Sequence, residues 1–108
     1  MENPVSRRCL FVGTATRDIL MELEEPPASD RRLAARRVTS ASGGPAATAA
    51  AAFADLGGRG GLIAPVGRDE NGETVGRDLS ALGLAPLSLP VLDGPTAFSV
   101  ILVEPGGK

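Results

Sequence analysis

The stretch Ser42-Gly-Gly-Pro-Ala-Ala-Thr-Ala-Ala-Ala-Ala-Phe-Ala-Asp-Leu56, followed directly by Gly57, decides the fold of this chain. A small residue, a proline near the first helical position, helix-forming residues and a closing glycine are the expected order of helix signals. We therefore predict a helix over residues 46–56. Because its side chains are almost all small, its backbone should pack close to a sheet.

Apolar runs on both sides of this helix predict strands. Residues 9–13 form a continuous apolar run ended by glycine, which is typical of a strand buried on both faces of a parallel sheet, with Cys9 as a small core residue. Residues 62–66 read as a short apolar strand, and residues 75–82 carry Val and Leu at helical spacing. This alternation of strands and helices indicates βαβ units.

Other strands fall outside that alternation. Residues 18–24 read as a strand, and the polar residues 31–42 read as an exposed strand that returns beside it, which gives a hairpin arm over residues 18–41. Residues 87–92 and 96–104 are expected to form two more strands. The fold class is therefore α/β, with one small domain as the most that 108 residues can hold.

Composition excludes several kinds of chemistry. The chain has no His and one Cys, so a Ser-His-Asp triad, a Cys-His pair and a structural zinc site are out of reach within it. A net charge of −2 offers no attraction to nucleic acid or to an anionic membrane. The single Cys suits a reducing compartment, and no leader peptide or membrane-spanning run is visible, so we expect a soluble, cytoplasmic protein.

Two positions are candidates for binding an oxygen-rich ligand. Gly43 and Gly44 open the predicted helix, where bare backbone and the positive helix end favour oxygen-rich or anionic groups, although a simple loop-to-helix turn remains the alternative. Asp18 follows the first strand at the edge where ligands collect in α/β sheets, and a carboxylate there can accept hydrogen bonds from a polyol. An ordinary loop acid, or a partner for Arg17, is its alternative.

Two other polar clusters have structural explanations. Residues 67–72 lack the ligand spacing of a calcium loop, and a helix start capped by Asp69 or Asn71 is favoured instead. Arginines at positions 31, 32, 36 and 37 offer phosphate contacts, but no aromatic side chain lies nearby, so a solvated arm is favoured.

Together these pieces resemble the N-terminal third of a ribokinase-like (pfkB family) carbohydrate kinase. The resemblance rests on the spacing of the stretch from Gly43 to Ala50, then Gly57 and Gly67, which matches the first signature of that family. It extends to Asp18 after the first strand, to the loop at residues 66–72 and to the strand at residues 95–103. It covers residues 8–108.

The resemblance implies a ribokinase-like fold, with a partial, mostly parallel sheet, flanking helices and a small β lid. Residues 1–108 would be the N-terminal part of one domain. The lid strands would lie at about 18–41 and 96–103, and the βαβ core at about 8–13 and 43–92.

The resemblance also implies an ATP-dependent kinase that phosphorylates a primary hydroxyl of a sugar. Asp18 would hold sugar hydroxyls, and Gly43 and Gly44 would pack against the sugar. Thr48 and Thr16 stand where the family often has Asn, so a hydroxyl replaces an amide twice and the hydroxyl pattern of the sugar should differ from that of ribose.

No catalytic residue and no metal ligand is assigned within the chain. In the family, the catalytic base lies in a Gly-Ala-Gly-Asp turn far downstream, together with the nucleotide pocket and the segment linked to magnesium, so ATP and Mg²⁺ are implied with sites mostly outside residues 1–108. We therefore expect the chain alone to be inactive.

Three other functions remain open at this point. One is a nucleoside kinase of the same family, another is a non-enzymatic module that binds or dimerises through the lid strands, and the third is a small nucleotide-binding α/β domain of another type. A homodimer through the lid fits the first two as well as the sugar kinase. The sequence leaves open which sugar binds and which hydroxyl is phosphorylated.

Overall fold

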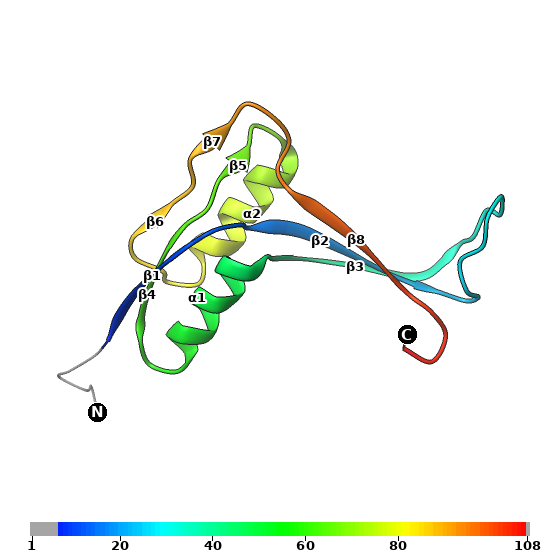
Figure 1. Ribbon diagram of the computed structural model, residues 1–108, viewed down its shortest axis with the longest axis horizontal. Helices are drawn as coiled ribbons and strands as arrows, with labels where there is room; N and C mark the ends of the chain where they lie inside the picture. Colours follow the sequence, from blue (N-terminus) through cyan, green and yellow to red (C-terminus); the bar gives the residue numbers. More distant parts are fainter. Residues whose placement is uncertain (1–6, 108) are drawn as a thin grey trace.

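A computed structural model describes residues 7–107, which form an α/β part and a long three-stranded sheet that extends from it (Figure 1). The long axis measures 57 Å, against 35 and 18 Å for the other two. The elements, in order, are β1 (Arg8–Val12), β2 (Thr16–Leu23), β3 (Ala35–Gly43), α1 (Pro45–Asp55), β4 (Arg59–Ile63), β5 (Val66–Gly67), α2 (Glu70–Ser80), β6 (Leu87–Ser88), β7 (Val91–Leu92) and β8 (Phe98–Val103).

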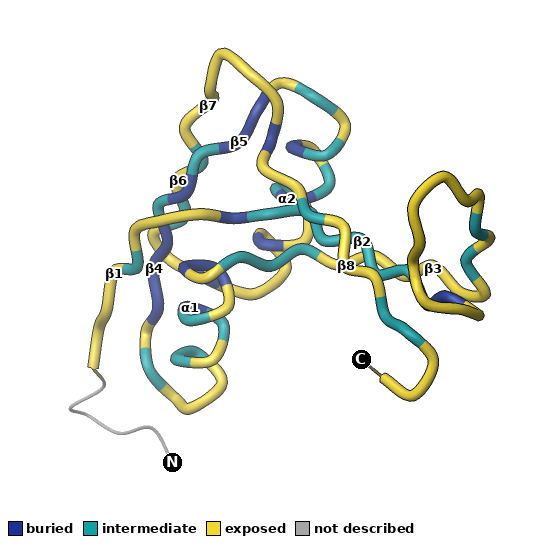
Figure 2. Tube along the Cα trace, turned by 45° about the vertical axis from the view of Figure 1, so that its right-hand side comes forward, coloured by how far each residue is buried: buried dark blue, intermediate teal, exposed yellow. Residues whose placement is uncertain are grey.

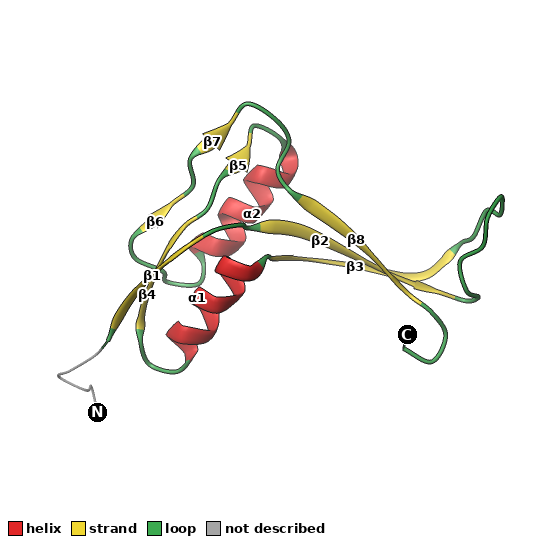
Figure 3. Ribbon diagram, viewed as in Figure 1, coloured by secondary structure: helices red, strands yellow, loops and turns green. Residues whose placement is uncertain are grey.

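The α/β part contains the parallel sheet β1-β4-β6 and the parallel pair β5-β7. In the sheet, Cys9 lies opposite Gly60 and Phe11 lies opposite Leu62. Helix α1 connects toward β4 and α2 connects toward β6, which confirms the predicted alternation of strands and helices (Figure 3). The two connections run in the same direction along the sheet β1-β4-β6. Right-handed crossovers in one direction place their helices, here α1 and α2, on the same face of the sheet.

Alanine makes up half of the buried residues in the core between these helices and the sheet. Its buried residues are Ala15, Ala46, Ala47, Ala50, Leu62, Ala64, Val66, Val75, Leu79 and Leu84. Helix α1 lies so close to β4 that a Cβ on Gly60 would stand 3.0 Å from the carbonyl oxygen of Ala50. At the edge of this core, the rings of Phe11 and Phe53 meet edge to face with centroids 5.7 Å apart.

The prediction that the first strand is buried on both faces was wrong. Strand β1 is mostly exposed, with Val12 at 69% and Leu10 at 49%, and Cys9 is exposed rather than a core residue (Figure 2). Within residues 7–107, β1 pairs with β4 alone, and the core lies on one face of the sheet. The apolar side chains of the other face therefore remain accessible.

The second sheet has the order β3-β2-β8, with β2 antiparallel to β3 and parallel to β8. The antiparallel pairing agrees with the predicted hairpin. Strand β2 begins at Thr16, so Asp18 lies within a strand. The alternative interpretation of Asp18 as an ordinary loop acid is therefore wrong. The predicted strand at residues 96–104 is found as β8.

Prolines divide two of the predicted strands. The run at residues 62–66 belongs to β4 and β5, with Pro65 between them, and the run at residues 87–92 belongs to β6 and β7, with Pro90 between them. Proline has no N–H to donate to a strand ladder, which explains both interruptions. The second helix ends at Ser80, so Leu82 lies beyond it and is exposed.

Candidate functional site

Asp18 lies on the middle strand of the second sheet, opposite Ala41 of β3 and Ser99 of β8. The hydroxyl of Thr16 donates a hydrogen bond to Oδ1 of Asp18 at 2.8 Å, and the hydroxyl of Ser99 donates to the same oxygen at 2.7 Å. No hydrogen bond from residues 7–107 reaches the other carboxylate oxygen, Oδ2. That oxygen is open to a ligand.

Gly43 provides the space in which Oδ2 lies. A Cβ built on Gly43 would stand 2.7 Å from Oδ2 of Asp18 and 3.9 Å from Oγ1 of Thr48. Thr16 is the partner of Gly43 across the β2-β3 ladder. The structure therefore brings Asp18, Gly43, Thr48 and Thr16 together, although they come from three elements.

Gly44 connects this point to the start of α1. It is the N-cap residue, with a φ of 99° that favours glycine, and no side chain caps the helix there. A Cβ on Gly44 would stand 2.6 Å from the carbonyl oxygen of Thr14, so the chain passes this turn only with a bare backbone. The first helical hydrogen bond runs from the N–H of Thr48 to the carbonyl of Gly44 at 2.9 Å, and the N–H groups before it have no partner within the helix.

The arrangement suits a ligand that carries several hydroxyl groups. The Oδ2 atom can accept a hydrogen bond from a ligand hydroxyl, and a hydrogen bond to a charged acceptor is about twice as strong as one between neutral groups. The Thr48 hydroxyl can donate or accept, and the helix start favours oxygen atoms of a ligand.

On the other face of the second sheet, Asp78 of α2 holds the two strands that carry the site. Ser42 donates a hydrogen bond to Oδ2 of Asp78 at 2.6 Å, and Arg17 lies 3.5 Å from the same oxygen. Arg17 also donates to the hydroxyl of Ser40 at 2.7 Å. The charged partner of Arg17 is therefore Asp78, and not Asp18 as one reading of the sequence suggested.

Asp69 fixes the start of β8 to the start of α2. Its Oδ1 accepts hydrogen bonds from the N–H of Gly72 at 2.8 Å and from the hydroxyl of Thr96 at 2.5 Å, and its Oδ2 accepts from the N–H of Thr96 at 2.9 Å. The hydroxyl of Thr96 in turn accepts from the N–H of Gly67 at 2.8 Å. These bonds, foremost the one from the Thr96 hydroxyl, lower the pKa of Asp69. The helix cap predicted for Asp69 is confirmed.

The arginines of the hairpin arm pair with neighbouring acids. Arg31 lies 3.1 Å from Glu25, and Arg36 and Arg37 lie 3.8 and 3.5 Å from Glu22. All three side chains are more than half exposed. This agrees with the interpretation of the arm as a solvated segment.

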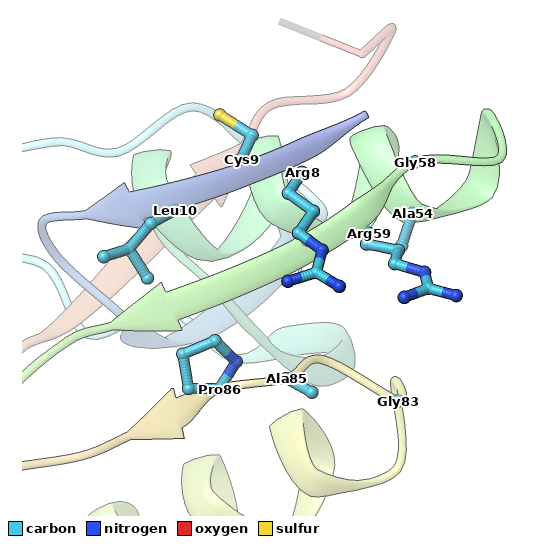
Figure 4. A pocket seen from close by; sticks show the side chains of 10 residues that line it. Arg8, Cys9, Leu10, Ala54, Gly58, Arg59, Gly83, Ala85 and Pro86 are labelled. Carbon is cyan, nitrogen blue, oxygen red and sulfur yellow. The ribbon is translucent and has the colours of Figure 1, made fainter. Parts of the chain in front are cut away.

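Two cavities lie apart from the carboxylate of Asp18. One of about 680 Å³ lies at the start of β1 and β4, where Figure 4 shows Arg8 and Arg59 on neighbouring strands near Pro86. The other, of about 360 Å³, lies between the two helices and is lined partly by Ser42, Thr48 and Leu79. Asp18 lines neither cavity, so the candidate site is a surface formed by strand, turn and helix start.

Two further features are absent from residues 7–107. No group of three or more His, Cys, Asp or Glu side chains in this part of the chain is arranged to hold a metal ion. Neither of its helices is long and apolar enough to cross a membrane.

Sequence reasoning identified Asp18, Gly43, Gly44, Thr48 and Thr16, but missed Ser99 and Asp78. Ser99 is the only polar residue in the sequence of β8, and that isolated hydroxyl was the available signal. Asp78 carried no such signal, because its partner Ser42 lies 36 positions away and belongs to a different element.

Comparison with known proteins places the chain. Residues 6–108 match the family described as pfkB family carbohydrate kinase. An ATP-dependent ribose-1-phosphate kinase of Halopiger xanaduensis is 33% identical over 102 residues, which are 94% of this chain and 34% of that protein.

Solved structures agree with this match. A ribokinase of Cryptococcus neoformans in complex with ADP has a TM-score of 0.75 at 27% identity, over 95% of this chain and 32% of that one. An Arabidopsis thaliana ribokinase with ribose and ATP has a TM-score of 0.77 at 24% identity, over 96% of this chain and 34% of that one, and it shows the shared ribokinase-like α/β fold. The chain thus spans about a third of the length of these relatives. It belongs to the pfkB family of carbohydrate kinases.

Proposed function

We propose that this chain carries the sugar-binding part of an ATP-dependent kinase that phosphorylates a primary hydroxyl of a sugar. The observation that carries the proposal is the meeting of Asp18 Oδ2, the bare backbone of Gly43 and the Thr48 hydroxyl at the start of α1. The relative from Halopiger xanaduensis is named an ATP-dependent ribose-1-phosphate kinase, which supports a phosphorylation of this class.

Each candidate residue has a role in this proposal. Asp18 accepts a hydrogen bond from a sugar hydroxyl, and Gly43 and Gly44 let the sugar approach the backbone. Thr16 orients the carboxylate of Asp18 through its 2.8 Å hydrogen bond, and Thr48 offers its hydroxyl to the sugar. Two short hydroxyls at these positions favour a hydroxyl pattern different from that of ribose.

The sheet β3-β2-β8 serves as the lid in this proposal. It extends from the α/β part (Figure 1). Asp18 belongs to β2, the middle strand of this sheet. A cover over the bound sugar would exclude water, which would otherwise compete for the transferred phosphoryl group. The hydrogen bonds of Asp69 with Thr96 connect this sheet to α2.

We assign no magnesium ligand to residues 7–107, where no three His, Cys, Asp or Glu side chains gather around a common point. We assign no catalytic base and no nucleotide pocket to them either. In the proposal, ATP, Mg²⁺ and the base act from sites mostly outside this chain, and the chain alone does not turn over ATP. The reducing cytoplasm, which keeps a lone thiol such as that of Cys9 reduced, is the proposed location.

A homodimer through the second sheet is a second candidate role. Phe98, Val100 and Leu102 alternate along β8 and are 57%, 48% and 46% exposed, so one face of the sheet presents a row of large apolar side chains. Such rows mark contact surfaces. A second copy of this chain is the proposed occupant, and light scattering on the purified chain tests it.

The test of the main proposal is a titration of the purified chain, labelled with ¹⁵N, with D-ribose, D-fructose and adenosine. We expect saturable shifts of the Gly43, Gly44 and Thr48 amides with a sugar, their loss in the Asp18→Asn variant, and no ATP hydrolysis. Binding of adenosine alone would favour the nucleoside kinase. A folded dimer that binds none of the three would favour the binding module, and sugar-dependent ATP turnover would show that the chain contains its own catalytic base.

A further inference from the structure

We propose that Ser99 is a specificity-determining residue of the sugar site. By sharing Oδ1 of Asp18 with Thr16, Ser99 leaves only Oδ2 for the ligand. Asp18 then binds one sugar hydroxyl, where an unshared carboxylate would bind two neighbouring hydroxyls. This inference rests on the proposed sugar-binding function and adds to it the number of hydroxyls that Asp18 recognises.

The first step of the argument is that Oδ1 is fully used. A carboxylate oxygen offers about two acceptor positions. The hydroxyls of Thr16 and Ser99 lie 2.8 and 2.7 Å from Oδ1, which are ordinary distances for good O–H···O hydrogen bonds. A ligand hydroxyl that approaches Oδ1 would have to displace one of them.

The second step is that both donors are held in place. Thr16 lies on the same strand as Asp18, two residues before it, and Ser99 lies directly opposite Asp18 on the neighbouring strand. Both strands are fixed by ladder hydrogen bonds, and the start of β8 is fixed further by the bonds of Thr96 with Asp69. The two hydroxyls therefore need no rearrangement to occupy Oδ1.

The third step is that the site opens at Oδ2. That oxygen lies beside Gly43, where the missing side chain leaves room, and the Thr48 hydroxyl lies on the same side. A sugar that enters over Gly43 meets one charged acceptor atom. The hydroxyl next to the bound one has to use a neutral partner, such as the Thr48 hydroxyl, and contributes less to affinity.

Ser99 itself supports a selective role. It is the only polar residue of β8, whose sequence is Phe-Ser-Val-Ile-Leu-Val, and its hydroxyl bonds to Asp18. An alanine would fit the same strand without any hydrogen-bond partner. Packing of the strand therefore does not require a hydroxyl at position 99, whereas the hydrogen bond to Oδ1 of Asp18 does.

The experiment compares D-fructose, 3-deoxy-D-fructose and 4-deoxy-D-fructose by NMR titration of the wild-type chain and of the variants Ser99→Ala and Ser99→Thr. In the wild type, removal of one hydroxyl should weaken binding by about tenfold or more, and removal of the other by less than about threefold. In Ser99→Ala, both removals should weaken binding about tenfold, because Oδ1 has become free for the second hydroxyl. Ser99→Thr keeps the donor and should restore the wild-type pattern.

Other outcomes overturn the inference. Equal losses for the two deoxy sugars in the wild type would show that Asp18 already binds both hydroxyls. An unchanged pattern in Ser99→Ala would show that Ser99 does not limit Asp18, while the proposed function would stand. No binding of D-fructose to the wild type overturns the inference, and failure of every sugar in the panel overturns the proposed function as well.

Discussion

The carboxylate of Asp18 lies in the space that Gly43 leaves open: a Cβ on Gly43 would stand 2.7 Å from Oδ2. The two residues belong to neighbouring strands, and the absence of one side chain sets the position of the other. The orientation of Oδ2, the carboxylate oxygen that is open to a ligand, therefore depends on a glycine that itself contributes no functional group.

Replacing Gly43 by Ala should move the Asp18 carboxylate and weaken sugar binding by about tenfold or more, because a hydrogen bond to a charged group would be lost. The measurement is the NMR titration with D-fructose. The control is Gly76→Ala in α2, where the added Cβ would meet Leu89 at an ordinary 3.5 Å. That change should keep the affinity and raise the free energy of unfolding by about 0.5–1 kcal/mol. Wild-type affinity in Gly43→Ala would contradict the prediction.

The free energy of unfolding should decrease at acidic pH because Asp69 becomes protonated. Hydrogen bonds hold the pKa of this carboxyl below its ordinary value of 3.8 in the folded chain. Because the pKa of Asp69 is lower in the folded than in the unfolded chain, its charged form stabilises the fold at any pH above the unfolded-state pKa of about 4. This contribution is lost as the pH falls from there through the folded-state pKa. Urea unfolding between pH 7 and pH 2.5 should show a steeper loss for the wild type than for Asp69→Asn, which has no group to titrate there. Parallel curves would exclude this role.

Thr96→Val should destabilise the fold without changing its shape. Valine has the size of threonine but leaves the buried N–H of Gly67 without its acceptor, which costs about 1–3 kcal/mol. Chemical denaturation measures the difference. Thr39→Val on exposed strand β3 is the matched control and should change the free energy of unfolding by less than about 0.5 kcal/mol. Equal stabilities of the two variants would argue against the bond.

Asp78→Ala should loosen the strands of the site from α2. The variant removes the acceptor of Ser42 and the charge opposite Arg17. Because Asp78 is about half exposed, we expect a loss of stability under about 1 kcal/mol. Hydrogen exchange of amides 40–43 should be faster, and sugar affinity should fall several-fold. Asp93→Ala, in the exposed turn after β7, is the control. Unchanged exchange at residues 40–43 would refute the coupling.

Gly60→Ala should test the close approach of α1 to the sheet. Its Cβ would stand 3.0 Å from the Ala50 carbonyl oxygen, so helix and strand would have to separate, at a cost of about 1–3 kcal/mol. The control is Gly94→Ala, where an added Cβ would meet nothing within 4 Å. Thermal unfolding compares the two, and a stability of Gly60→Ala equal to that of the control would contradict the packing described for α1.

Local signals predicted much of the fold. Glycine and proline positions predicted the ends of helix α1, the polar residues at 69–71 predicted the cap, and apolar spacing predicted the alternation of strands and helices. All of these depend on residues close in sequence. The burial of β1 was predicted incorrectly because an apolar run such as residues 9–13 shows that two faces are apolar. It does not show that anything covers them.

The arrangement of the candidate site could be predicted from the sequence only in part, for a related reason. Asp18 and Gly43 stand at positions with a recognisable local context, a strand and a helix start. The partners Ser99 and Asp78 depend on strand register and helix placement, which periodicity does not determine. Register decides which residue of β8 lies opposite Asp18, and a slip of one position would replace the Ser99 hydroxyl by an apolar side chain.

The hydrogen bond from Ser99 to Asp18 joins positions 81 residues apart, and this separation has a kinetic consequence. The β2-β3 hairpin closes through the connection at residues 24–34, whereas the parallel pairing of β2 with β8 closes a loop that contains both helices. Long-range parallel pairing of this kind is intrinsically slow, because the entropy of closing the long loop has to be overcome first. During synthesis, Asp18 therefore leaves the ribosome long before the strand that orients its carboxylate, and a chain interrupted before β8 would contain the acid without a formed site.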